Sequence, residues 1–168
     1  MIQVYTGDGK GKTTAAFGQA FRAAGAGLKV KMVQFGKIEP SSEGKIAIEN
    51  NIFDVECFWL PGFLKPGDDP GPYRKKTLEG IEYVHKLIEN NPPDMLVLDE
   101  IIVVYALGVI DEDEFRTLLQ SIPEHLELVL TGRGAPEWLI EKAHLVTEMK
   151  KIKHYYDLGM KARNGIEQ

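Results

Sequence analysis

The residues best suited to chemistry form one short stretch near the N-terminus, Gly7-Asp8-Gly9-Lys10-Gly11-Lys12-Thr13-Thr14. An apolar run precedes this stretch and a helical pattern follows it. In that context, glycines let backbone N–H groups converge on an anion, and the N-terminus of the next helix adds unpaired donors. Lys12 would reach the distal phosphates of a nucleotide, and the Thr13 hydroxyl could bind a magnesium ion. The stretch therefore predicts a phosphate-binding loop.

The loop is one residue shorter than the common pattern. The usual spacing G-x-x-x-x-G-K-[ST] requires a glycine where this chain has Thr6, and the first glycine is Gly7 instead. A shorter loop can still bind phosphates, but we expect it to hold the nucleotide in a different pose.

A second group of residues has the chemistry to hold a metal ion. The apolar run that starts at Asp94 ends in two carboxylates, Asp99 and Glu100, as the Walker B strand does beside a P-loop. Either carboxylate could hold magnesium, directly or through water. Because many strands end in acidic residues, the pair gains its meaning from the phosphate loop earlier in the chain.

Three further polar residues follow apolar runs. In open α/β sheets, ligands bind beyond the carboxyl ends of the strands. Gln34 and Lys37 lie at such an end, where a pocket and a solvated strand end are both open alternatives. Arg133 suits either a triphosphate contact or a structural ion pair with the acidic strand end, and we slightly favour the ion pair.

The elements that must position these residues alternate along the chain, which predicts a mostly parallel sheet flanked by helices. The expected strands cover residues 2–5, 28–35, 53–59, 94–100, 126–130 and 145–152, the last at a sheet edge. The expected helices cover residues 12–26, 41–51, 73–90, 101–107, 112–120 and 136–143. Asp111 and Glu114 should form a capping box at the start of the fifth helix. We expect one α/β domain over residues 1–168, with the three layers of a RecA-like P-loop NTPase.

Composition excludes several classes of protein. A net charge of −5 over 168 residues argues against broad nucleic-acid binding, which needs a basic surface. No apolar run approaches the roughly 18 residues of a membrane span, and the N-terminus lacks the pattern of a signal peptide. Cys57 is the only cysteine, which favours a cytoplasmic protein. We expect it to be a small buried side chain rather than a nucleophile.

A loop rich in proline and glycine, residues 60–72, is too punctuated for regular structure. It carries Phe63 and Leu64 on backbone that should be exposed. These side chains could fold back onto the core, or they could form a lid or wall over a large apolar ligand.

Together these motifs resemble the P-loop type ATP:corrinoid (cob(I)alamin) adenosyltransferases. The resemblance spans nearly the whole chain, through residues 6–18, 33–35, 62–63, 94–100, 130–134, 146–149, 153–155 and 165–166. It implies transfer of the 5′-deoxyadenosyl group of ATP to Co(I) of cobalamin or another corrinoid, with release of triphosphate, in cobalamin biosynthesis or salvage. It also implies that ATP is bound in the reverse sense to common P-loop enzymes, since C5′ and not the γ-phosphate must face the acceptor.

The resemblance also implies roles for individual residues. The residues from Gly7 to Thr13 would grip the triphosphate, with Lys12 and Mg²⁺ neutralising its charge. Thr13 and Glu100 match the magnesium ligands of the family. Phe63 matches an aromatic residue that displaces the lower axial ligand of cobalt, whereas Lys65 lies where better-known members carry a tryptophan. A homodimer and a reductant protein, such as a flavodoxin-like donor, are implied as partners.

Two other functions remain as alternatives. The replacement at Lys65 is compatible with an ATP-dependent corrinoid-binding carrier or sensor that lacks transferase activity. A nucleotide kinase would also use a P-loop, but the missing loop residue argues against it.

Overall fold

The computed structural model describes residues 1–62, 64 and 68–166, so the predictions for Phe63 and Lys65 lie outside the described residues. Six parallel strands form one sheet in the order β3-β2-β4-β5-β1-β6. The strands are β1 (Ile2–Thr6), β2 (Val30–Phe35), β3 (Asp54–Phe58), β4 (Met95–Asp99), β5 (Glu127–Thr131) and β6 (Leu145–Glu148). The predicted parallel sheet is confirmed.

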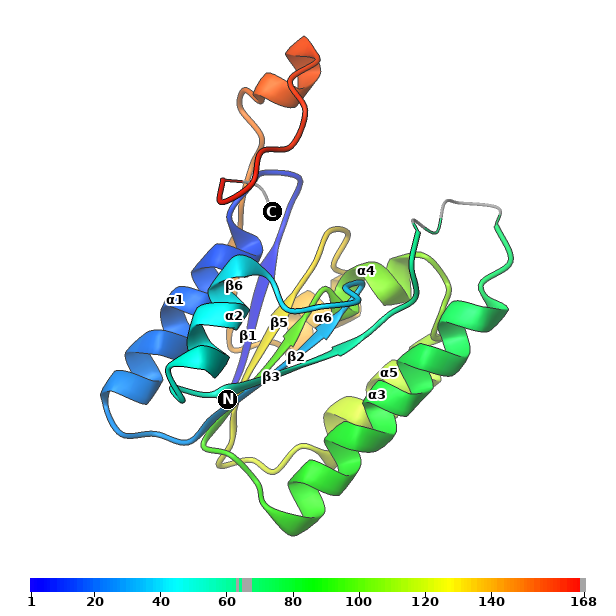
Figure 1. Ribbon diagram of the computed structural model, residues 1–168. Coiled ribbons are helices and arrows are strands. Elements are labelled where there is room, and N and C mark those ends of the chain that lie inside the picture. Colours follow the sequence, from blue (N-terminus) through cyan, green and yellow to red (C-terminus); the bar gives the residue numbers. More distant parts are fainter. Residues whose placement is uncertain (63, 65–67, 167–168) are drawn as a thin grey trace.

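Helices cover both faces of the sheet and complete the three layers (Figure 1). They are α1 (Lys12–Gly25), α2 (Ser42–Glu49), α3 (Gly71–Asn90), α4 (Ile101–Ala106), α5 (Glu112–Ser121) and α6 (Glu137–Lys142). One apolar cluster joins the sheet to α1 and α2, and a larger one joins it to α3, α4, α5 and α6. Strand β4 is buried along its whole length, as expected for a parallel strand covered on both faces.

Element boundaries differ from the predictions where local hydrogen bonds intervene. Strand β2 begins at Val30 and not at residue 28, because the Leu28 N–H donates to Ala23 O (3.1 Å) and closes the end of α1. Strand β6 ends at Glu148 and not at residue 152, because the next residue, Met149, bonds to the phosphate loop through its carbonyl. The predicted edge position of β6 is confirmed.

The predicted capping box of α5 is present. The Asp111 Oδ1 atom accepts from the Glu114 N–H (2.8 Å), and Glu114 Oε2 accepts from the Asp111 N–H (2.9 Å). Two otherwise unpaired N–H donors are thereby satisfied. None of the helices in the described ranges is long and apolar enough to cross a membrane.

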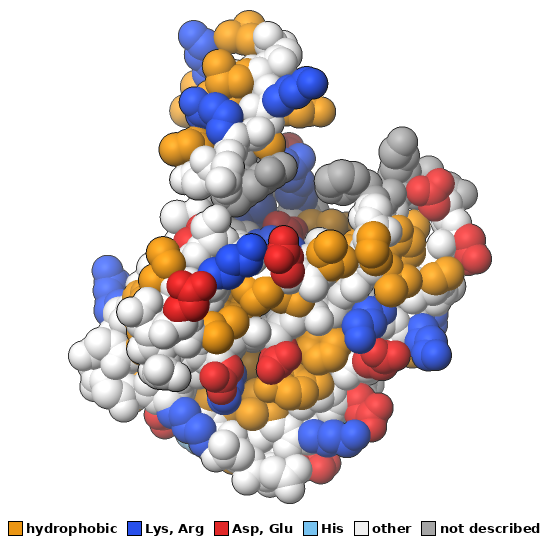
Figure 2. Space-filling model, viewed as in Figure 1, with side chains coloured by type: hydrophobic (Ala, Val, Ile, Leu, Met, Phe, Trp, Pro, Cys, Tyr) orange, Lys and Arg blue, Asp and Glu red, His pale blue; other side chains and the backbone are white. Residues whose placement is uncertain are grey.

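The chain after β6 forms a tail, residues 149–166, that projects above the carboxyl edge of the sheet beside the loop between β1 and α1 (Figure 1). It contains one 3₁₀ turn, η1 (Tyr155–Leu158). Hydrophobic and basic side chains crowd its surface (Figure 2), and Ile152 is 91% exposed. This tail contrasts with the buried sheet and borders the candidate site described next.

Candidate active site

The phosphate loop connects β1 to α1 and is held against the start of the tail. Gly7 and Gly11 have φ values of 97° and 116°, in the region where only glycine is unstrained. The Gly9 N–H donates to Met149 O (2.6 Å), and a Cβ atom on Gly9 would lie 2.6 Å from that carbonyl oxygen. Backbone conformation and close approach therefore explain the glycines of this loop.

Lys12 points into the loop that precedes it. Its Nζ atom donates to Gly7 O (2.7 Å) and Gly9 O (2.8 Å), and the residue is 6% exposed. Burial lowers the pKa of Lys12, while the nearby Glu100 carboxylate acts in the opposite direction. The ammonium group is thus placed inside the loop where a phosphate would bind.

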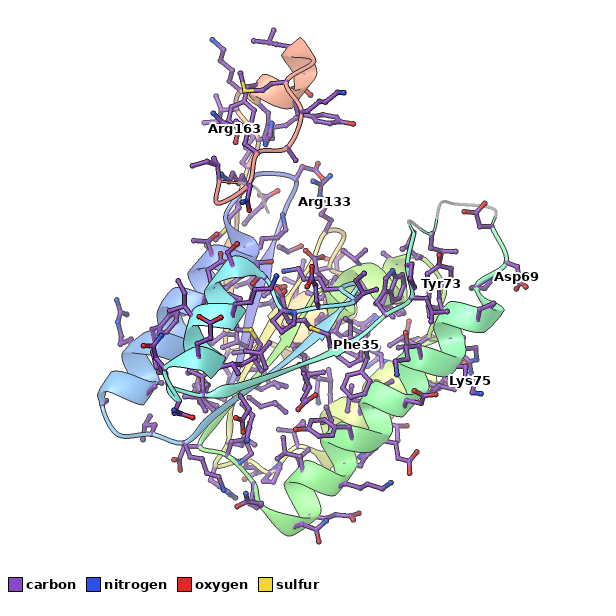
Figure 3. The ribbon with its side chains drawn as sticks, in the orientation of Figure 1. Phe35, Asp69, Tyr73, Lys75, Arg133 and Arg163 are labelled. Atoms are coloured by element: carbon purple, nitrogen blue, oxygen red, sulfur yellow. The ribbon has the colours of Figure 1, made fainter. Side chains whose placement is uncertain are left out.

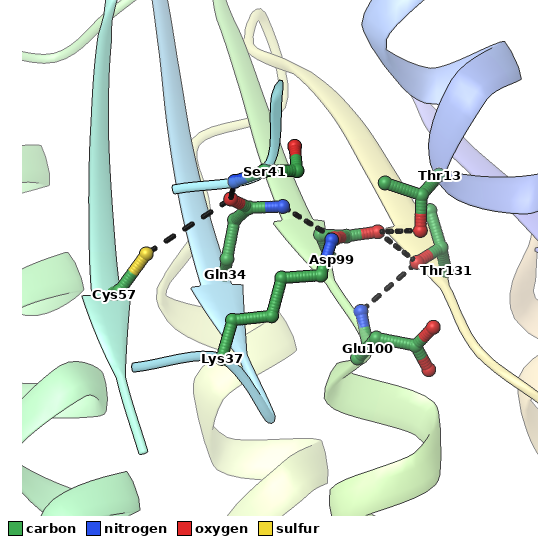
Figure 4. A network of polar contacts seen from close by, with 8 residues as sticks. All are labelled: Thr13, Gln34, Lys37, Ser41, Cys57, Asp99, Glu100 and Thr131. Carbon is green, nitrogen blue, oxygen red and sulfur yellow. Dashed lines mark hydrogen bonds and ion pairs between the residues drawn. The ribbon is translucent and has the colours of Figure 1, made fainter. Parts of the chain in front are cut away.

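Asp99 is the centre of a buried polar network at the end of β4 (Figure 4). Its Oδ1 atom accepts from the hydroxyls of Thr13 (2.9 Å) and Thr131 (2.7 Å). Its Oδ2 atom accepts from Gln34 Nε2 (2.8 Å) and Lys37 Nζ (3.2 Å). Asp99 is fully buried, and four donors surround its carboxylate. The structure therefore brings Gln34 and Lys37 to the acidic strand end, which the sequence left open.

Glu100 differs from its neighbour in conformation and in the freedom of its carboxylate. Its φ of 63° lies in the left-handed region, and its N–H donates to Thr131 Oγ1 (2.9 Å). It occupies the N-cap position of α4 without a capping side-chain bond. Its carboxylate extends away from the Asp99 network (Figure 4) and lines the cavity. Burial, reinforced by the charge of Asp99, raises the pKa of Glu100.

The oxygen atoms of Thr13, Asp99 and Glu100 fit a magnesium ion. Mg²⁺ prefers oxygen ligands and usually takes one or two carboxylates, with substrate phosphates and water completing its shell. Within the described residues, no group of three or more acidic, histidine or cysteine side chains forms a full protein cage. The donor set thus suits a metal that arrives with a nucleotide.

Arg133 follows β5 and lies between the carboxyl edge of the sheet and the tail (Figure 3). It is exposed and lines the cavity. Within the described residues Arg133 forms no salt bridge with Asp99 or Glu100, but its positive charge counteracts the rise in the pKa of Glu100. The choice between a triphosphate contact and an ion pair with the acidic strand end therefore stays a prediction.

One cavity of about 1060 Å³ extends from the phosphate loop to Trp59 and Leu60, which form an apolar wall. Besides residues 8–14, Glu100 and Arg133, it is lined by residues 36–43, Lys45, Ile46, Trp59, Leu60, Gly62, His154 and residues 164–166. Trp59 packs against Tyr73, with ring centroids 4.7 Å apart, and Leu64 packs against the larger core cluster. Part of the proline-rich loop therefore folds onto the core, and part of it borders the cavity.

The tail is a part of the site that sequence reasoning did not assign. Lys10 Nζ donates to Ile166 O (2.6 Å), and His154 and Asn164 line the cavity. No local spacing could have indicated this, because the contacts depend on the parallel pairing of β1 with β6. A second cavity of about 530 Å³ lies between Arg133 and the aromatic residues of the tail.

Comparison with known proteins identifies the family of this chain. Residues 1–168 match the family described as ATP:corrinoid adenosyltransferase BtuR/CobO/CobP. The chain is 38% identical over 170 residues to a corrinoid adenosyltransferase from Sinorhizobium sp, covering 99% of this chain and 79% of that one. It is 34% identical over 169 residues to the corrinoid adenosyltransferase of Escherichia coli K12, covering 99% and 85%.

A solved structure supports the fold alone. The KaiC-like protein from Pyrococcus horikoshii OT3 superposes with a TM-score of 0.54 at 16% identity, covering 90% of this chain and 73% of that one. The predicted RecA-like architecture is thereby confirmed. The motifs, the whole-length match and the curated relatives agree, and the chain belongs to the ATP:corrinoid adenosyltransferase family.

Proposed function

We propose that this corrinoid adenosyltransferase uses the large cavity to bring C5′ of ATP to Co(I) of cobalamin or a related corrinoid. A cobalt–carbon bond forms as the bond from C5′ to the triphosphate oxygen breaks, so the products are the adenosylated corrinoid and triphosphate. The observation that carries the proposal is that the short phosphate loop, Glu100 and the apolar stretch at Trp59 all line one cavity.

The phosphate loop supplies the grip on the leaving group. We assign Gly7, Asp8, Gly9, Lys10, Gly11, Lys12, Thr13 and Thr14 to the triphosphate. Lys12 and Arg133 would offset the negative charge that develops on the leaving oxygen, and such preorganised charge is often the largest catalytic term. Since Co(I) is itself the nucleophile, the protein needs no general base and contributes mainly orientation.

A magnesium ion bound with ATP would neutralise further charge on the triphosphate. We assign Thr13 and Glu100 as its protein ligands. Asp99 already accepts from four donors, which favours contact through water. Gln34 and Lys37 would hold Asp99 in place through its Oδ2 atom, while the two threonines bind its Oδ1 atom.

The apolar wall would receive the corrin ring. Trp59 and Leu60 line the same cavity as the phosphate loop, which supports this placement. Phe63 remains a proposal from its motif, as the aromatic residue that displaces the lower axial ligand of cobalt.

We further propose that residues 1–168 act as one domain in a cytoplasmic homodimer. All four residues of the edge strand β6 are exposed, including Leu145 and Val146, whereas strands of parallel sheets are normally covered. Sedimentation of the wild type and of Val146→Lys tests the dimer.

A reductant protein such as a flavodoxin-like donor would supply the electron that converts Co(II) to Co(I).

The direct test is an anaerobic reaction of the protein with chemically reduced cob(I)alamin and MgATP. The proposal expects the adenosylcobalamin spectrum with intact triphosphate, and loss of both in Lys12→Ala but not in Lys86→Ala, an exposed lysine on α3. ADP with unchanged cobalamin would overturn it. Tight corrinoid binding without product would instead support a carrier or sensor.

A further inference from the structure

We propose that Thr131 is a positioning residue that sets both acidic side chains of the site for MgATP. This inference rests on the proposed magnesium site. Thr131 lies at the end of β5, between β4 and β1 in the sheet, and is fully buried. It lies next to the strand that ends in the acidic pair and to the strand that leads into the phosphate loop.

The direction of the two hydrogen bonds at Thr131 follows from its partners. A backbone N–H can only donate, so the Thr131 hydroxyl accepts from Glu100 (2.9 Å). A carboxylate can only accept, so the same hydroxyl donates to Asp99 Oδ1 (2.7 Å). One oxygen atom thereby links the backbone of Glu100 to the side chain of Asp99 (Figure 4).

The bond to Glu100 acts on an unfavourable conformation. Glu100 has a φ of 63°, which a residue with a side chain adopts only where its surroundings hold it. In this conformation its carboxylate caps no N–H of α4 and lines the cavity instead. Without the Thr131 hydroxyl, the Glu100 N–H would lose its partner and the conformation would lose one of its restraints.

The bond to Asp99 acts on the magnesium ligand Thr13. Both threonine hydroxyls donate to Asp99 Oδ1. Since Thr13 donates its only hydroxyl proton to Asp99, its lone pairs are left for a metal ion. Thr131 holds the acceptor that orients Thr13, and so acts on both proposed ligands of Mg²⁺ without touching the nucleotide.

The test separates positioning from a purely structural role. ATP binding is measured by calorimetry with Mg²⁺ and with EDTA, for wild type, Thr131→Val and Thr131→Ser. Val keeps the shape but removes the hydroxyl, and Ser keeps both hydrogen bonds. Thr77→Val is the matched control, because Thr77 is equally buried and its hydroxyl has no hydrogen-bond partner in the described structure.

Mg²⁺ should raise the ATP affinity of Thr131→Val roughly tenfold less than it raises that of the wild type, because a lost hydrogen bond to a charged group has about this effect. The ATP affinity in EDTA should be unchanged. Thr131→Ser and Thr77→Val should retain the gain. The inference would be overturned if Thr131→Val weakened ATP binding equally in Mg²⁺ and in EDTA, or if it kept the full Mg²⁺-dependent gain. Loss of that gain in Thr131→Ser would also overturn it.

Two further outcomes are distinguishable. A wild type without any Mg²⁺-dependent gain would overturn the magnesium site, and this inference with it. If Thr131→Val does not fold, Thr131→Ala takes its place. The inference then requires that Thr131→Ser keep the Mg²⁺-dependent gain in ATP affinity and that Thr131→Ala lose it.

Discussion

Two regions that border the cavity are built differently. At the phosphate end, Asp99 is fully buried and accepts from four donors contributed by β2, β5, α1 and the chain after β2. Beside the phosphate loop, the tail is mostly exposed, and its contacts with the loop include a side-chain bond from Lys10 and a backbone bond at Gly9. The first region is buried and its contacts support one another, whereas most residues of the second are exposed to solvent.

This difference suggests a division of labour. Fixed charges placed before the substrate arrives are most effective where charge develops during reaction, and we propose that the triphosphate is held at the phosphate end. The exposed tail lies outside this charged network, so we expect it to affect ATP binding without stabilising the charge that develops. Substitutions at the phosphate end should therefore reduce the rate strongly, and substitutions at the tail should change binding slightly.

The largest effect is expected at Lys12. Lys12→Ala should lower adenosyl transfer roughly 10³-fold, about 4 kcal/mol of transition-state stabilisation, because it removes the charge inside the loop. Single-turnover formation of the cobalt–carbon bond measures this. Lys12→Arg keeps the charge and should recover part of the rate. A loss below tenfold in the alanine variant would mean that the phosphate end is not where charge is stabilised.

Glu100→Gln should lower the transfer rate roughly 10²-fold, since the amide is a poor magnesium ligand.

The same substitution should increase the stability of the folded protein. Burial and the charge of Asp99 raise the pKa of Glu100, so the ionised carboxyl destabilises the folded state at neutral pH. In EDTA without nucleotide, the glutamine variant should then melt at a higher temperature than wild type.

That stability difference should depend on pH. As pH falls through the raised pKa, the folded wild type takes up a proton and gains stability relative to the unfolded chain. Below the ordinary glutamate value of 4.5 the carboxyl is protonated in both states, and the advantage of Glu100→Gln should disappear. Glu89→Gln, an exposed change on α3, should show no such trend. A pH-independent difference would contradict the burial argument.

A smaller effect is expected where the tail contacts the phosphate loop. Lys10→Ala removes the side-chain contact with Ile166 O but keeps the backbone N–H of the phosphate loop. Contacts of exposed lysines contribute little. ATP affinity should fall about two- to fivefold with the transfer rate at saturation nearly unchanged. Lys153→Ala, also in the tail, serves as the control. A large fall in rate at saturating ATP would show that the tail belongs to the fixed part of the site.

The smallest effect is expected at Cys57. Burial raises the pKa of Cys57 to about 11, so the thiol stays protonated and is a poor nucleophile. Its Sγ atom lies 3.9 Å from Gln34 Oε1, at the limit of a weak hydrogen bond. Cys57→Ala should change the transfer rate by less than about twofold. Inactivation of the wild type, but not of the variant, by a thiol reagent would contradict this.

Local patterns along the chain were sufficient to predict the phosphate loop, the acidic pair and the order of the elements. The capping box of α5 also follows from spacing alone, because its bonds join residues three positions apart. Such features depend on backbone geometry within a few residues, and sequence displays them directly.

Tertiary structure alone decided which strand ends meet. Thr131, Gln34 and Thr13 reach Asp99 because β5 and β2 flank β4 in the sheet and α1 packs over it. The tail reaches the phosphate loop because β6 pairs with β1. These contacts join residues far apart in the chain, and no spacing records them. The sequence thus determined which groups are available for chemistry, and strand order determined which of them act together.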